Sequence, residues 1–149
     1  MAGREFNRSA SDKPGPTPTV DWLAHAVIGL AIKVHRVLGP GLLESIYEEA
    51  LCVELELARI PFQRQVPVEI YYASRNIGTA RLDLLVRRQL IVELKAVENI
   101  AAVHIAQVLS YLRFTDMSLG LLINFHVREL RHGIKRVVLT PSNVSLQPK

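Results

Sequence analysis

Apolar residues recur at three- and four-residue steps in three stretches of the chain, and this spacing predicts an amphipathic helix in each. The first runs from Val20 to Leu38 and ends at Gly39-Pro40-Gly41, a combination that stops helices. The second runs from Leu42 to about Arg59 and ends before Pro61. The third covers Ala101 to Phe114. Three helices are therefore expected, the first two joined by a tight corner.

Between the second and third helices the pattern changes to an alternation of apolar and polar residues, which is typical of strands. Strands are predicted from Val66 to Tyr72, Ile77 to Val86 and Leu90 to Ala96, joined by short turns into an antiparallel meander. Leu119 to Val127 is almost continuously apolar, as in a strand covered on both faces, and Ile134 to Leu139 forms a shorter strand. The order helix, helix, three strands, helix, strand, strand indicates an α/β fold.

Length and composition favour one folded domain. The chain has 149 residues, of which 49% are hydrophobic and 21% charged, an ordinary globular balance with room for a single core. Residues 1–19 mix Gly, Ser, Pro and charges and are expected to form a disordered tail ahead of a single domain at residues 20–149. No stretch is apolar for long enough to cross a bilayer, so no membrane association is expected. The single cysteine, Cys52, excludes a disulfide scaffold and favours a reducing, cytoplasmic setting.

The net charge of +4 suits a polyanionic partner without requiring one. No base-reading module accompanies the basic residues, so we assign no set of phosphate contacts among them. The candidates are Arg81, Arg87, Arg88, Arg113, Arg128, Arg131, Lys135 and Arg136.

The residues with the clearest chemistry lie on two neighbouring predicted strands. Glu93 and Lys95 are two apart and project to one face, while Val92 and Leu94 project to the other and can pack. Asp83, on the preceding strand, would come near Glu93 if the register allows it. Two carboxylates beside a lysine match the needs of a hard cation such as Mg²⁺. Taken alone, the spacing favours the alternative of an exposed ion pair between Glu93 and Lys95 with a solvated Asp83.

Several segments, in order, match a family pattern. Gly41 to Tyr47 reads G-x-x-E-x-x-Y, and the chain resembles the GxxExxY protein family, a bacterial branch of the PD-(D/E)xK nuclease superfamily. The resemblance covers roughly His25 to Leu139. Its other matching segments are Leu38–Gly41, Asp83–Val86, Val92–Ala96, Gln107–Leu112 and Gly120–Phe125.

This resemblance implies a restriction-endonuclease-like core. Such a core has a central mixed sheet of four or five strands flanked by helices, and here we expect the first two helices near one edge and the third crossing between strands. The implied activity is metal-dependent hydrolysis of phosphodiester bonds in nucleic acid, with DNA as the expected partner and Mg²⁺ or Mn²⁺ as cofactor. A homodimer is expected if so small a domain cuts both strands.

The resemblance also implies roles for individual residues. Asp83 and Glu93 would bind the metal with the Leu94 carbonyl, Lys95 would position the attacking water, and Glu44 would complete the site directly or through a water. Leu82 replaces the proline that precedes the aspartate in the family motif, which removes no ligand.

Further residues have weaker assignments. Gln107 and Tyr111 resemble the Q-x-x-x-Y element of the RecB-like branch, which touches substrate, and His104 would share their helix face. The alternative for these residues is an ordinary half-buried helix surface. Tyr47 is expected to be a packing residue whose hydroxyl finds a partner.

Two other classes of function stay open. The first is a catalytically silent nucleic-acid-binding or protein-interaction domain that keeps the nuclease fold, and the second is a structural subunit of a complex. In a structural subunit, Glu44, Asp83, Glu93 and Lys95 would be individually replaceable with little functional loss.

Overall fold

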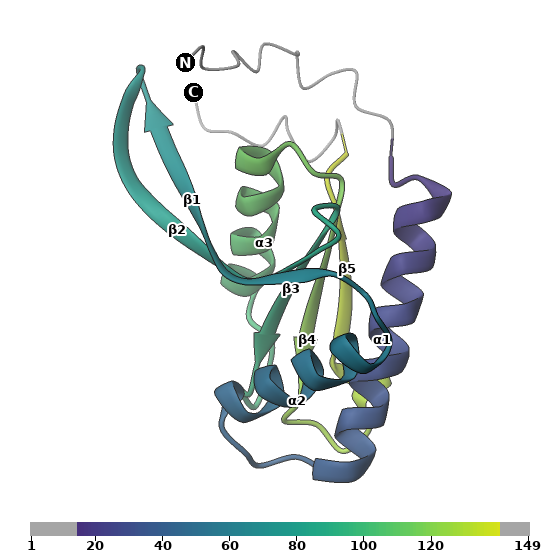
Figure 1. Cartoon of the computed structure of the whole chain (residues 1–149). Coiled ribbons are helices and arrows are strands. Elements are labelled where there is room, and N and C mark those ends of the chain that lie inside the picture. Colours follow the sequence, from purple (N-terminus) through teal and green to yellow (C-terminus); the bar gives the residue numbers. More distant parts are fainter. Residues whose placement is uncertain (1–14, 141–149) are drawn as a thin grey trace.

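The computed structural model describes residues 15–140, and within them the chain forms the expected sequence of helices and strands (Figure 1). A short 3₁₀ helix, η2, was not predicted. The elements are α1 (Pro18–Leu38), α2 (Glu44–Leu57), β1 (Phe62–Tyr72), β2 (Arg75–Val86), β3 (Leu90–Lys95), α3 (Ala102–Thr115), β4 (Leu119–Asn124), η2 (Leu130–Gly133) and β5 (Ile134–Val138).

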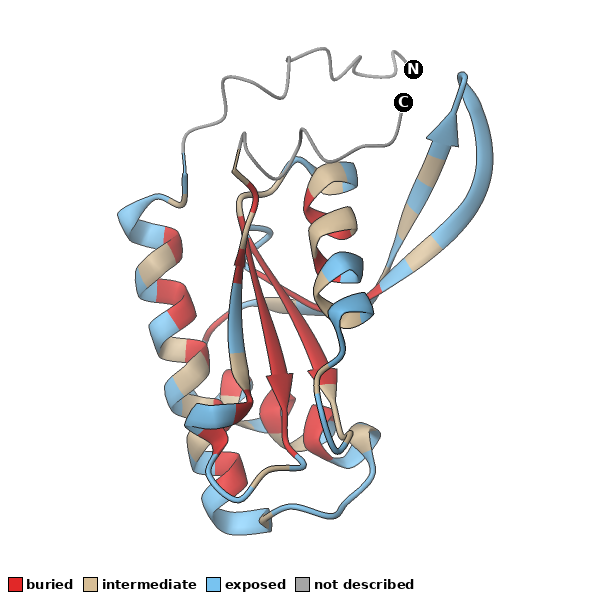
Figure 2. Ribbon diagram, turned by 180° about the vertical axis from the view of Figure 1, so that it is seen from behind, coloured by how far each residue is buried: buried red, intermediate tan, exposed pale blue. Residues whose placement is uncertain are grey.

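The five strands form one mixed sheet in the order β1-β2-β3-β4-β5. Neighbouring strands are antiparallel except for β3 and β4, which are parallel and joined by α3 as a crossover. Every residue of β4 is buried, because helices cover both of its faces (Figure 2). The predicted α/β fold with its antiparallel meander is thus confirmed.

The first two helices cover a face of the sheet, so the expectation that they lie near one edge was wrong. Leu23 of α1 and Leu51 of α2 share a core with Val92 and Leu94 of β3. On the opposite face, Val108 of α3 packs in a second core with strand residues. The central strands are apolar on both sides, and burying both sides requires a helical layer on each.

Helix α1 begins earlier than predicted, at Pro18, with Thr17 as its N-cap. The Oγ1 of Thr17 accepts a hydrogen bond from the amide of Val20 at 3.4 Å. The expected tail therefore does not include Pro18 and Thr19, whereas residues 1–14 lie outside the described residues. Proline at the first position suits a helix start because its missing N–H has no intrahelical partner there.

The β1–β2 hairpin changes the face it buries part-way along its length. Phe62 and Leu84 contact the core under α1 and α2, whereas Val66 and Leu82 contact the core under α3. All four are even-numbered, and in a regular strand they would share a face. The change occurs at Gln65, whose φ of 49° is left-handed and which lies between the pairs Arg64–Leu84 and Val66–Leu82. The outer half of the hairpin is thereby redirected toward α3 (Figure 1).

Tyr47 fixes the corner between α1 and α2. Its hydroxyl donates to the carbonyl of Gly39 at 2.5 Å and accepts from the amide of Leu42 at 3.1 Å. Its ring stacks on Phe125 with 4.5 Å between centroids. The predicted packing role with a hydroxyl partner is confirmed. Because α2 begins at Glu44, the bonds that hold the corner also fix the position of the Glu44 carboxylate.

We predict that Tyr47→Phe lowers the free energy of unfolding by about 1–3 kcal/mol, because it removes both hydrogen bonds that hold the corner between the helices. Urea denaturation would measure the loss. Tyr72→Phe is the matched control, since that side chain is 73% exposed and should be replaceable without effect. Equal stability of the two variants would contradict a structural role for the Tyr47 hydroxyl.

Candidate active site

The site forms where the ladder between β2 and β3 ends. The ladder pairs residues as far as Leu84 with Val92, and the next pair would be Asp83 with Glu93. Side chains replace that pair: Glu93 Oε1 accepts from the amide of Asp83 at 3.0 Å, and Asp83 Oδ2 accepts from the amide of Leu94 at 2.9 Å. The register condition for bringing the two carboxylates together is therefore met.

Burial and like charge act on this pair together. Glu93 is only 3% exposed, while Asp83 is half-buried. Loss of solvent, and then the charge of Asp83, raise the pKa of Glu93 to about 8, although nearby Lys95 acts in the opposite direction. The two carboxylates thus form a site where a cation would be stabilised.

Lys95 is half-buried on the same strand, and no ion pair within residues 15–140 engages its ammonium group. Val92 and Leu94 lie in the core under α1 and α2, so the predicted alternation of β3 is confirmed. The charged side chains of Glu93 and Lys95 are thereby left to the other face.

Asn124 holds the chain directly after Lys95. It is paired with Lys95 in the parallel ladder and is 2% exposed. Its Oδ1 accepts from the amides of Val97 (3.1 Å) and His126 (3.2 Å), and its Nδ2 donates to the Val97 carbonyl (2.8 Å). No role was predicted for this residue from the sequence, although a polar side chain within an apolar strand was the available signal.

Glu44 faces the same site from the start of α2. It lines an open cavity of about 460 Å³. Burial, and then the charge of Asp83, raise the pKa of Glu44, with Lys95 acting against them. The Glu44 carboxylate therefore lies within the influence of the charges on Asp83 and Lys95. The residues lining the cavity are Leu43, Glu44, Ser45, Glu48, Gln65 and Asp83.

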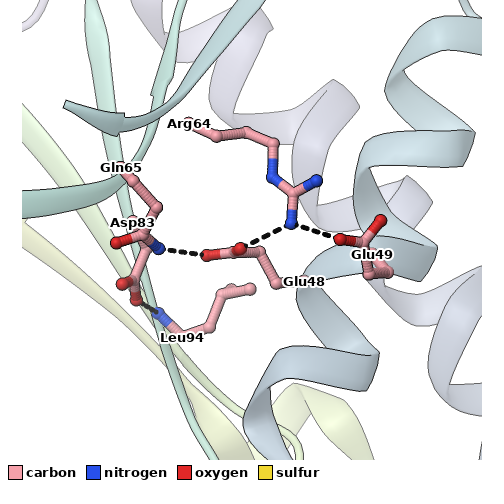
Figure 3. Close-up of polar contacts among 6 residues, drawn as sticks. All are labelled: Glu48, Glu49, Arg64, Gln65, Asp83 and Leu94. Carbon is pink, nitrogen blue, oxygen red and sulfur yellow. Dashed lines mark hydrogen bonds and ion pairs between the residues drawn. The ribbon is translucent and has the colours of Figure 1, made fainter.

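A hydrogen-bonded network joins α2 to β1 along this cavity (Figure 3). Glu48, which is 9% exposed, accepts from Arg64 Nη2 at 2.7 Å and from Gln65 Nε2 at 2.8 Å. Arg64 also donates to Glu49 at 2.7 Å. These bonds neutralise Glu48 and hold Gln65 beside Asp83. Sequence reasoning missed Gln65 as a cavity residue, because nothing in the sequence marks its left-handed backbone.

The two residues proposed from α3 have different surroundings. Tyr111 is 7% exposed, and its pKa is raised by burial and then by the charges of Glu93 and Asp83, so its hydroxyl lies within their influence. Gln107, one turn earlier, is exposed. The Nδ1 of His104 accepts from the amide of Ala101 at 3.0 Å, which makes it a cap of the helix rather than a neighbour of the carboxylates.

The donors suit a hard divalent cation that keeps much of its water. Within residues 15–140, no three His, Cys, Asp or Glu side chains converge closely enough to hold a metal ion by themselves. Asp83 and Glu93 provide two carboxylates. Mg²⁺ commonly binds through one or two carboxylates and retains several waters. The raised pKa of Glu93 gives a physical reason for a cation there.

Comparison with known proteins agrees with this geometry. The model of the PD-(D/E)XK nuclease superfamily matches residues 21–137. The chain belongs to this superfamily. Its members generally use divalent metal ions, and their substrates are nucleic acids. The matched span includes Glu44, Asp83, Glu93 and Lys95. No curated protein matches the chain. Among the described helices, none combines the length and apolarity that a membrane crossing requires.

We predict that, without metal, the protein loses stability as pH rises from 4.5 toward about 8 through the titration of Glu93. Its folded-state pKa lies above the unfolded value, so the native state keeps a proton that the unfolded state has released. Added Mg²⁺ should raise the melting temperature more at about pH 8 than at about pH 5, because the ionised carboxylate is the ligand.

The variant Glu93→Gln should show neither the pH dependence nor the Mg²⁺ effect in thermal melts. Glu98→Gln, at an exposed position, is the matched control and should behave as wild type. A Glu93→Gln protein that keeps the wild-type response to pH and Mg²⁺ would show that other groups cause it.

Proposed function

We propose that this protein is a metal-dependent nuclease that hydrolyses phosphodiester bonds in DNA with Mg²⁺ or Mn²⁺. The observation that carries the proposal is the interlocked pair of Asp83 and Glu93, with Lys95, which has no ion pair within residues 15–140, on the same strand as Glu93. Superfamily membership supports the reaction class. Choosing DNA rather than RNA rests on the expectation from the sequence, whereas the net charge of +4 suits either polyanion.

The cation would be held by Asp83 and Glu93 with the Leu94 carbonyl, and when bound it supplies Lewis acidity toward a phosphoryl oxygen and its own water. Holding the carboxylates in place is the task of the protein. The amides of Asp83 and Leu94 donate to the carboxylates, so these are oriented before any substrate arrives.

Lys95 is suited to positioning the attacking water, because an ammonium group donates three hydrogen bonds and accepts none. Glu44, across the cavity, would complete the site directly or through a water. The hydroxyl of Tyr111 lies near the carboxylates, and the exposed Gln107 one turn away would contact substrate at the rim.

The cellular setting is also part of the proposal. The buried Cys52 thiol, whose pKa is raised to about 11 by desolvation, fits a reducing cytoplasm. A bacterial origin follows from the resemblance to the GxxExxY family. A homodimer would place two sites on opposite strands of a duplex.

We predict metal-dependent cleavage that Lys95→Ala and Asp83→Asn each reduce at least about 100-fold, because each removes a group that acts at the reacting phosphate. The assay compares single-stranded, duplex and branched DNA and RNA in Mg²⁺, Mn²⁺ or chelator. Lys33→Ala, at an exposed position on α1, is the matched control and should cut as wild type.

Equal cleavage by all four proteins would assign the cutting to a contaminant and remove the support for this site. Salt-sensitive binding of nucleic acid without any cleavage would instead favour the catalytically silent binding domain.

A further inference from the structure

The outer part of the β1–β2 hairpin, residues 66–82, is here called the arm; its base packs in the core under α3, and its outer end projects from the body of the protein (Figures 1 and 2). From Glu69 to Thr79 every residue except Ile70 is exposed. The exposed fraction is 57% for Tyr71, 73% for Tyr72 and 63% for Ile77. Exposed aromatic and branched side chains on a projecting ribbon contribute nothing to the core, and their gathering there indicates a partner.

The charge of the arm selects the kind of partner. The arm contains two arginines, Arg75 and Arg81, and one carboxylate, Glu69, which accepts a hydrogen bond from the Tyr71 hydroxyl at 2.8 Å. Arg75 is paired with Tyr72 next to the turn, and Asn76 is paired with Tyr71. The arm therefore has an excess of one positive charge, and the arginine, tyrosines and asparagine at its tip suit a polyanion that offers bases and phosphates.

The base of the arm lies at the candidate active site. Gln65 and Asp83, the residues at which the hairpin changes face, both line the cavity with Glu44. A nucleic acid entering that cavity therefore meets the arm as a continuation of the same surface.

We propose that the arm lies in the major groove of a DNA duplex whose scissile phosphate is at the Asp83–Glu93 site, an inference that rests on the proposed function. The major groove of B-form DNA, about 12 Å wide, admits a two-stranded ribbon. The deep, narrow major groove of A-form RNA does not. The arm thus selects duplex DNA.

The length of the arm fixes where it contacts the duplex. Eight residues separate Asp83 from Arg75. At about 3.3 Å a residue they span about 26 Å, which corresponds to about eight base pairs. The tip therefore contacts DNA about eight base pairs from the cleaved bond.

Pairing of the arm with a second copy through the edge strand β1 is disfavoured by β1 itself. Pro67 removes a backbone donor from that edge, and the register shifts between Ile70 and Tyr71. Proline and irregular register are features that prevent edge-to-edge association.

The test shortens the arm by replacing Tyr71–Ile77 with Asn-Gly, which closes the paired residues Ile70 and Gly78 with a two-residue turn. Binding is measured by fluorescence anisotropy in chelator, on duplexes of about 10 and about 24 base pairs. Shortening should weaken binding to the long duplex about tenfold and affect the short duplex much less, because few binding positions on the short one extend as far as the tip.

A point variant tests the same contact without altering the hairpin. Arg75→Ser should lower the slope of binding against salt by about one, as expected for one lost phosphate contact. Arg36→Ser, exposed near the end of α1, is the matched control and should leave the slope unchanged.

Unchanged binding of the long duplex by both arm variants would overturn the inference. An equal loss on single-stranded DNA or duplex RNA would also overturn it, since neither offers the groove. So would analytical ultracentrifugation showing that shortening converts a dimer to a monomer while duplex binding is kept.

The two proposals fail separately. Arm-dependent duplex binding by a protein that never cleaves would refute the nuclease and retain the arm. Metal-dependent cleavage with arm-independent binding would retain the nuclease and refute the role of the arm.

Discussion

Two carboxylates held side by side where a strand ladder stops are the constraint on which the rest of the site depends. Asp83 and Glu93 take the place of a ladder pair, and each accepts a backbone amide of the opposite strand. A buried carboxylate is costly unless hydrogen bonds or a positive charge compensate it. The amides supply the hydrogen bonds and orient the carboxylate oxygens, and Lys95 supplies part of the positive charge. The rest of the cost of burying the charge raises the pKa of Glu93, and a bound cation would offset it.

Groups around this pair are fixed by contacts outside it. Tyr47 binds both sides of the corner before α2 and so sets the position of Glu44, while Asn124 binds the chain directly after Lys95. Neither side chain needs to touch a substrate. Their buried hydrogen bonds give a polar site a rigid frame, which is the condition for orienting a reacting water and phosphate.

Local patterns predicted most of the elements and the alternation that separates Glu93 and Lys95 from the core. The pairing of Asp83 with Glu93 followed the expected meander, since only a short turn separates the strands. The layer occupied by α1 and α2 was not predictable, because an apolar stripe shows that a helix is buried and not against which face. The early start of α1 was missed because apolar periodicity does not include a cap, although Thr17 followed by Pro18 is a local start signal. The cavity residue Gln65 was missed because a left-handed backbone is set by three-dimensional context.

The left-handed Gln65 explains why Asp83 is accessible at all. Leu82 and Leu84 are both fully buried, yet they lie in cores on opposite faces of the sheet. That arrangement requires the hairpin to turn over between them, and the residue at the pivot is Asp83, which stays half-buried beside the cavity. A left-handed non-glycine residue costs about 1–3 kcal/mol, and the bond from Gln65 to Glu48 helps to hold it. The strain therefore lies where the fold opens one carboxylate to solvent while keeping its partner Glu93 buried.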